Sequence, residues 1–218
     1  MQARAGTATV ALAPVVILAA FLAHPFLVVL PDAEAVAAVL AENPTRWAVA
    51  HLLTAIGSAL IALAFLAVRV HLRNAGQDRF SPWGVPFVVF GSVLYAVLPG
   101  LEFAPLTAAE TGGDIAAVQA ALQPWFIPIF VTGAITFAIG IYAFARAIAD
   151  SAILGTRTTP VVVTGLAVLA GARAVPLGVV QFHVQAIAGV VALWPLAAVM
   201  WRAQSATASP RHRPSPAT

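Results

Sequence analysis

Long runs of apolar residues, separated by short polar segments, dominate the chain. A transmembrane helix needs about 20 such residues to cross roughly 30 Å of hydrocarbon. Pro176-Leu177-Gly178 divides the last and longest run with a turn. We therefore expect an all-α membrane domain over residues 1–203 and a flexible cytoplasmic tail over 204–218. The runs predict six transmembrane helices, at residues 7–30, 46–69, 82–104, 124–146, 159–177 and 180–202.

The composition agrees with this pattern, since 61% of the 218 residues are hydrophobic and only 9% are charged. Soluble domains carry roughly a quarter of their residues as charged side chains. The values exclude a soluble enzyme and a nucleic-acid binder with a dense basic face, and they make the lipid bilayer the expected partner. Whether the chain forms a homo-oligomer stays open. Cysteine is absent, so any metal must be held by His, carboxylate or neutral oxygen ligands.

The arginines predict the orientation of the bundle. Basic residues are retained on the cytoplasmic side of a membrane. With six spans and the N-terminus inside, only Arg46 and Arg173 fall on the outer side, whereas most acidic residues do. We expect a multi-pass protein of a bacterial cytoplasmic membrane with both termini inside.

Two outer connections are predicted to hold short interfacial helices. The segment from Asp32 to Glu42 reads as a helix capped by Asp32, and residues 114–122 repeat the design until Gln123-Pro124 ends it. Each segment is followed by a tryptophan at the head of the next span, Trp47 or Trp125. Tryptophan at that depth is typical of a membrane–water interface.

Ionisable side chains inside a membrane are costly and often functional. Four of them, His24, His51, Glu102 and His183, come from four different predicted spans. Counting residues from the prolines at the span ends places all four in the outer half of the membrane. Imidazole and carboxylate groups are the ligands that a transition-metal ion or haem iron takes in a chain without thiolates.

The two outer arginines make haem the leading hypothesis. Arg46 and Arg173 are placed to bind the two propionates of a haem b held by imidazoles, with Trp47 and Trp125 beside it. A single transition-metal ion is the other form of this hypothesis. His24, His51 and His183 are then the candidate ligands.

Glu102 is expected to be a further metal ligand, a hydrogen-bond partner of a ligand, or an acid/base that transfers protons. The expected role is redox chemistry, electron transfer or small-ligand binding, with a redox partner or ligand at the extracytoplasmic face.

Two alternatives stay open. A membrane-embedded zinc hydrolase would use the three histidines as ligands and Glu102 as general base. A metal-free transporter or structural membrane subunit would use these residues only for helix packing. The chain contains none of the nucleotide-binding, serine-hydrolase or HExxH motifs that would favour another class of enzyme.

Overall fold

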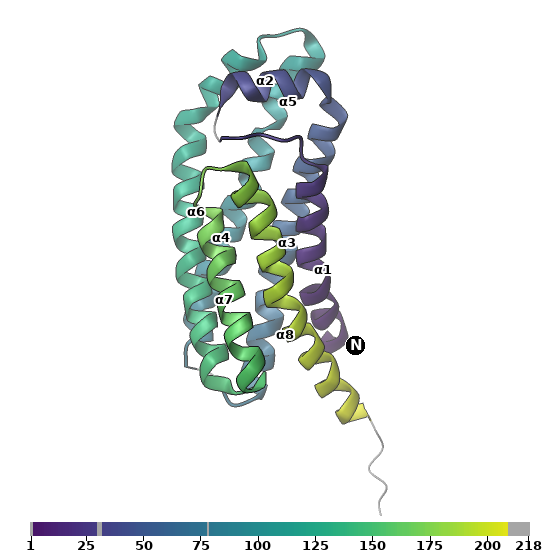
Figure 1. Cartoon of the computed structure of the whole chain (residues 1–218), viewed down its shortest axis with the longest axis vertical. Coiled ribbons are helices and arrows are strands. Elements are labelled where there is room, and N and C mark those ends of the chain that lie inside the picture. Colours follow the sequence, from purple (N-terminus) through teal and green to yellow (C-terminus); the bar gives the residue numbers. More distant parts are fainter. Residues whose placement is uncertain (1, 30–31, 78, 209–218) are drawn as a thin grey trace, which may run out of the picture.

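A computed structural model describes residues 2–29, 32–77 and 79–208, which fold as a helical bundle (Figure 1). Within them no regular strand occurs, so the predicted all-α class is confirmed. The helices are α1 (Gln2–Ala23), α2 (Ala33–Glu42), α3 (Pro44–Asn74), α4 (Ser81–Leu101), α5 (Phe103–Thr111), α6 (Ile115–Ser151), α7 (Gly155–Arg173), the π-helix η1 (Val179–Val184) and α8 (Gln185–Ala208).

Within the described ranges, five helical segments are long and apolar enough to cross a membrane. The helix α7 packs against α6 and α8 where a span was predicted at 159–177, but it is not among the five. The chain is therefore a multi-pass membrane protein by length and composition, whereas the sixth crossing and the orientation stay predictions. The five segments are Arg4–Ala23, Pro44–Asn74, Ser81–Thr111, Ile115–Ser151 and Val179–Ala206.

The helices of the first and third predicted spans end earlier than expected. The first was drawn to residue 30, but α1 stops at Ala23 and the described residues that follow are not helical. Pro25 explains this, because a proline disfavours the helical conformation of the residue before it. The third span was drawn through residue 104, but the helix breaks at Glu102. Pro105 cannot donate to the Leu101 carbonyl and its ring would crowd that carbonyl, so a separate helix, α5, begins.

The predictions for the two outer segments have different outcomes. The helix predicted after Asp32 is confirmed as α2, and the Asp32 carboxylate accepts the Ala35 N–H at 3.0 Å. Asp114 caps α6 in the same way, at 2.9 Å from the Ala117 nitrogen. The predicted end at Gln123-Pro124 is wrong, because α6 continues through Pro124 to Ser151. Packing of α6 against α2, α4 and α5 offsets the one hydrogen bond that this proline removes.

The predicted tail also begins later than residue 204, since α8 continues to Ala208. Residues 209–218 lie outside the described part of the chain. The prediction of a flexible segment there is therefore not addressed by the structure.

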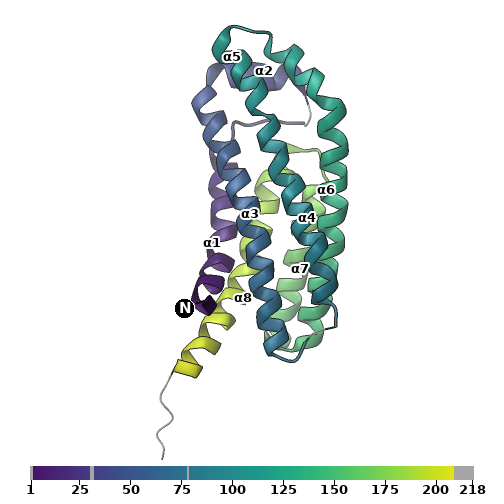
Figure 2. The ribbon, with the colours of Figure 1, turned by 180° about the vertical axis from the view of Figure 1, so that it is seen from behind.

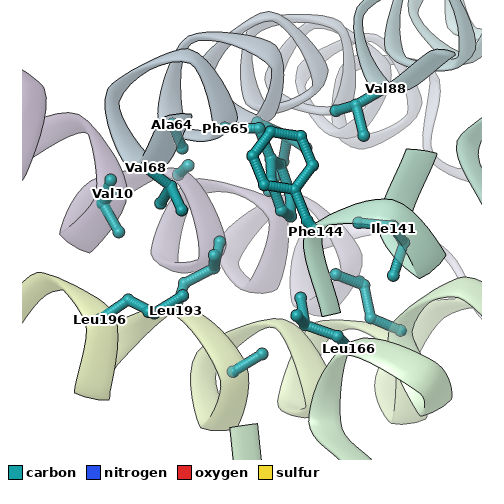
Figure 3. Packing of buried hydrophobic residues seen from close by; sticks show 14 of the residues in the cluster. Val10, Ala64, Phe65, Val68, Val88, Ile141, Phe144, Leu166, Leu193 and Leu196 are labelled. Atoms are coloured by element: carbon teal, nitrogen blue, oxygen red, sulfur yellow. The ribbon is translucent and has the colours of Figure 1, made fainter. Parts of the chain in front are cut away.

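The main core fills the middle of the bundle. Figure 3 shows Phe65 of α3 and Phe144 of α6 meeting between the helices, with Leu193 of α8 nearby. Glycines let α4 and α6 approach closely. A Cβ on Gly140 would lie 2.6 Å from the Val88 nitrogen, and one on Gly91 would lie 2.6 Å from the Phe137 nitrogen. Small residues at such contacts are typical of membrane helix pairs.

One end of the bundle, which we call the capped end, is covered by α2 and α5 (Figures 1 and 2). The turn between α7 and α8 stops short of this end, and the segment after α1 crosses the bundle between that turn and α2 (Figure 1). A second, smaller group of buried apolar residues lies here, and we call it the cap cluster. It consists of Leu27, Val36, Leu40, Trp47 and Leu106.

Candidate functional site

A half-enclosed cavity of about 70 Å³ lies between the main core and the cap cluster. Its walls come from α1, α2, α3, α4, α6, η1 and the segment after α1. The apolar and aromatic lining residues are Phe21, Leu27, Val36, Trp47, Leu98, Pro99, Phe126 and Phe182. The polar ones are His24, His51, Thr54, Tyr95, Glu102, Gln119 and Gln181.

His24 and His51 line the cavity side by side, with ring centroids 5.0 Å apart. His51 lies one helical turn after Trp47, so its Nδ1–H donates to the Trp47 carbonyl at 2.8 Å. His24 follows the last turn of α1, and its Nδ1–H donates to the Pro25 carbonyl at 2.6 Å. A carbonyl can only accept, so both rings carry a proton on Nδ1, and a neutral imidazole protonated there has a lone pair on Nε2.

Aromatic contacts hold the two imidazoles in place. The Trp47 ring lies 4.4 Å from the His51 ring and 5.2 Å from the His24 ring, centroid to centroid. Phe182 of η1 contacts His24 at 4.6 Å and Phe21 at 5.0 Å. The imidazoles therefore have little freedom to rotate, because each is bound at Nδ1 and packed on an aromatic face.

Glu102 lines the same cavity from the break between α4 and α5. The Gln119 Nε2 amide donates to Glu102 Oε1 at 3.0 Å, and the Trp47 indole N–H donates to the Glu102 carbonyl at 3.3 Å. A carbonyl oxygen has two lone pairs, so it can accept the indole N–H as well as a backbone N–H. Glu102 itself is only 6% exposed. Gln119 was not predicted as a site residue. It could have been found as a polar side chain on the inward face of α6, which is otherwise apolar.

The buried side-chain atoms that lack a partner around the cavity share one property. Glu102 Oε2, Gln119 Oε1 and Gln181 Oε1 make no hydrogen bond within the described residues, and all three are acceptors. No hydrogen bond of either histidine Nε2 is present there. The cavity therefore presents a surplus of lone pairs, which a cation or a hydrogen-bond donor would satisfy.

The other predicted site residues lie elsewhere. His183 is in η1 but does not line the cavity, and its Nδ1 is buried without a partner in the described structure. Arg46 donates to the carbonyls of Leu22, Ala23 and His24 at the end of α1. Trp125 is 69% exposed and also stays outside the lining.

Arg173 is buried between two aromatic rings. Its guanidinium carbon lies 4.0 Å from the centroid of Tyr95 and 3.7 Å from that of Phe137. These contacts, and its place in the last turn of α7, stabilise the cation without a carboxylate. The structure thus brings together His24, His51, Glu102 and Trp47, and it leaves both predicted propionate partners outside the cavity.

The spacing of the imidazoles allows a test of the two cofactors expected from the sequence. An ion about 2.1 Å from Nε2 lies about 3.2 Å from the ring centroid, so two imidazoles at a tetrahedral angle are about 5.2 Å apart. Two imidazoles on opposite faces of a haem would be about 6.4 Å apart by the same geometry. The 5.0 Å spacing fits one ion, whereas a porphyrin fits neither this spacing nor a cavity of about 70 Å³.

Across the described residues, no three His, Asp or Glu side chains come close enough together to hold one metal ion. Among the described lining residues, His24 and His51 are therefore the only imidazole pair, and Glu102 does not complete a group of three ligands with them.

In comparisons with known proteins, no family model, no curated protein and no solved structure matches this chain.

Proposed function

We propose that the chain is a membrane metalloprotein that binds a single transition-metal ion between His24 and His51. The surplus of lone pairs in a buried cavity carries this proposal. An unsatisfied buried acceptor costs about 1–3 kcal/mol. A protein gains no stability from several such atoms around one cavity, and a bound cation would offset their cost.

The histidines have the arrangement that metal ligands need. An imidazole that donates its Nδ1–H to a carbonyl presents Nε2 as a lone pair in a fixed direction. Glu102 supplies a negative charge near the cation, and its free Oε2 can accept or release a proton. A bound ion of this kind supplies a redox couple or a Lewis acid. Redox or small-ligand chemistry is the proposed role.

The location of the site supports a function at the membrane surface. Eighteen residues of α3 separate His51 from Arg69, a rise of about 27 Å. The cavity is therefore about one hydrocarbon thickness away from the arginines at the other end of α3. Because arginines mark the cytoplasmic side, we place the capped end on the extracytoplasmic side, within reach of a redox partner or ligand.

The test is metal content and the visible spectrum of the full chain purified in detergent. We expect close to one transition-metal ion per chain, which His24→Ala and His51→Ala reduce at least tenfold. His71→Ala is the matched control, because His71 lies on the same helix about 30 Å from His51. Retention of the ion by both cavity variants would contradict the proposed site.

The same measurements separate the alternatives. A Soret band that depends on His24 and His51 would contradict a single ion and show that the chain binds haem b. A colourless protein with stoichiometric zinc and hydrolytic activity dependent on Glu102 would favour the zinc hydrolase. A protein without metal or haem, unchanged by the histidine variants, would favour a transporter or structural subunit.

A further inference from the structure

The exposed part of the described cavity lining is confined to two side chains. Of the fifteen described residues that line the cavity, thirteen are buried, and only Phe126 and Phe182 are partly exposed. Phe126 belongs to α6 and Phe182 to η1. We therefore infer that this half-enclosed cavity opens beside Phe126 and Phe182, and we call these two side chains the portal.

Access from the capped end is closed. Leu27, Val36 and Trp47 line the cavity and also belong to the cap cluster, in which every member is at most 7% exposed. Access from the middle of the bundle is closed as well, because Phe21, Tyr95 and Leu98 belong to the main core. A ligand that reaches the imidazoles without unpacking either cluster must pass the portal.

The portal opens onto an apolar surface. Its neighbours Trp125, Ile127 and Val179 are 69%, 46% and 50% exposed, as expected for side chains that face lipid. Twenty residues of α6 separate Phe126 from Arg146, and twenty residues separate Phe182 from Arg202. Both portal residues are thus about 30 Å from an arginine along their helices, at the far edge of the hydrocarbon.

The size of the cavity limits what can enter. A protein cavity of about 150 Å³ binds benzene, which has six heavy atoms, so about 70 Å³ holds a molecule of two or three heavy atoms. Ions and polar solutes enter much more slowly than an apolar gas, because the route passes two phenyl rings at an apolar surface. A neutral gas such as dioxygen or nitric oxide meets both conditions, since it dissolves in the bilayer and fits the space.

We infer that the cavity receives a neutral diatomic gas directly from the bilayer, through the Phe126–Phe182 portal. The inference rests on the proposed function in that the gas would meet the metal ion at His24 and His51. The route itself is a property of the folded chain and can be measured without metal.

Trp47 is a built-in reporter for the test, since it is 1% exposed and lines the cavity. The other four tryptophans are at least 52% exposed and can be replaced by phenylalanine. Fluorescence of this single-tryptophan chain in lipid nanodiscs is quenched with dioxygen and, separately, with acrylamide dissolved in water. We expect dioxygen to quench Trp47 and acrylamide to have no effect.

Phe126→Ala and Phe182→Ala should each raise the dioxygen quenching constant at least twofold, because they widen the portal. Phe90→Ala is the matched control, since Phe90 is 51% exposed on α4 and does not line the cavity. If a portal variant fails to fold, Phe126→Leu takes its place. Quenching by acrylamide, or dioxygen quenching that is equal in the portal variants and the control, would overturn the inference.

A separate titration with Cu²⁺ keeps the two proposals apart. A paramagnetic ion bound at the imidazoles would quench the same Trp47, whose ring is 4.4 Å from His51. Absence of Cu²⁺ quenching together with portal-dependent dioxygen quenching would overturn the metal site and leave the portal. The converse result would overturn the portal alone.

Discussion

The seam between α4 and α6 and the cavity at the capped end represent opposite solutions to packing inside a membrane. At the seam, Gly84, Gly91 and Gly140 bring the helices so close that even a methyl group has no room. At the cavity, about 70 Å³ stays open and several polar atoms have no partner. The seam holds the helices together, whereas unpartnered polar atoms at the cavity cost stability, and this contrast supports our proposal that the cavity is the functional region.

Gly140→Ala should break the seam and give the largest loss of stability. The new Cβ would lie 2.5 Å from Val88 Cγ2 and 2.6 Å from the Val88 nitrogen, so the helices must move apart. Overpacking of this kind costs about 1–3 kcal/mol, which for a chain of this size lowers the Tm by roughly 2–12 °C. Thermal unfolding in detergent measures the effect.

Gly100→Ala is the control, because no atom lies within 4 Å of a Cβ at that position. Metal content per folded chain should be the same in both variants. Equal melting temperatures would show that the seam does not limit stability.

Gly178→Ala should damage the cavity more than the fold. Gly178 N–H donates to the Val28 carbonyl at 3.0 Å, and a Cβ at Gly178 would overlap the Leu27 carbonyl oxygen. The segment that carries His24 would then shift. We expect metal affinity to fall up to about 100-fold, since ligand positioning commonly contributes one to two orders of magnitude.

Gly171→Ala is the matched control near the same turn, because a Cβ there has nothing within 4 Å. Both variants are compared by equilibrium dialysis against the metal. An unchanged affinity in Gly178→Ala would mean that the segment after α1 does not position His24.

The contrast between the two regions also explains what the sequence predicts well. The presence of a helix depends on the length of an apolar run, which is a local feature. The caps at Asp32 and Asp114 are local as well, because each carboxylate accepts a free N–H three residues later in the chain. The break at Glu102 and the passage of α6 through Pro124 depend on neighbouring helices. Local rules give the wrong helix ends in both cases.

The depth of a residue along its helix can also be predicted from the sequence, whereas the side of the helix that faces the cavity cannot. Counting residues placed His24, His51, Glu102 and His183 in the outer half of the membrane, and three of these line the cavity. η1 is a π-helix, with more residues per turn than an α-helix, so it presents Gln181 and Phe182 to the cavity instead of His183. The aromatic sandwich around Arg173 joins distant helices and has no local signal in the sequence.

Glu102→Gln should weaken metal binding by about tenfold, a smaller effect than loss of an imidazole, because outer partners of ligands contribute 10–100-fold. The amide keeps the size of the side chain but removes the negative charge beside the cation. Glu110→Gln is the control on the exposed face of α5. A metal affinity unchanged by the cavity substitution would remove Glu102 from the site.

Arg46→Ala should have the smallest effect, and it tests the assignment of an arginine first predicted at a haem propionate. Arg46 Nε donates to the Ala23 carbonyl at 2.6 Å, and Nη2 lies 3.4 Å from the Leu22 and His24 carbonyls. Loss of this C-terminal cap of α1 should cost about 1 kcal/mol of stability. Arg157→Ala, an exposed arginine at the start of α7, is the control.

The two roles of Arg46 predict different readouts in the same variant. A capping residue changes the melting temperature and leaves metal content and spectrum as they are. A propionate partner would change cofactor retention and the position of a Soret band, with little change in stability. Since the guanidinium contacts three backbone carbonyls and does not line the cavity, we expect the first result.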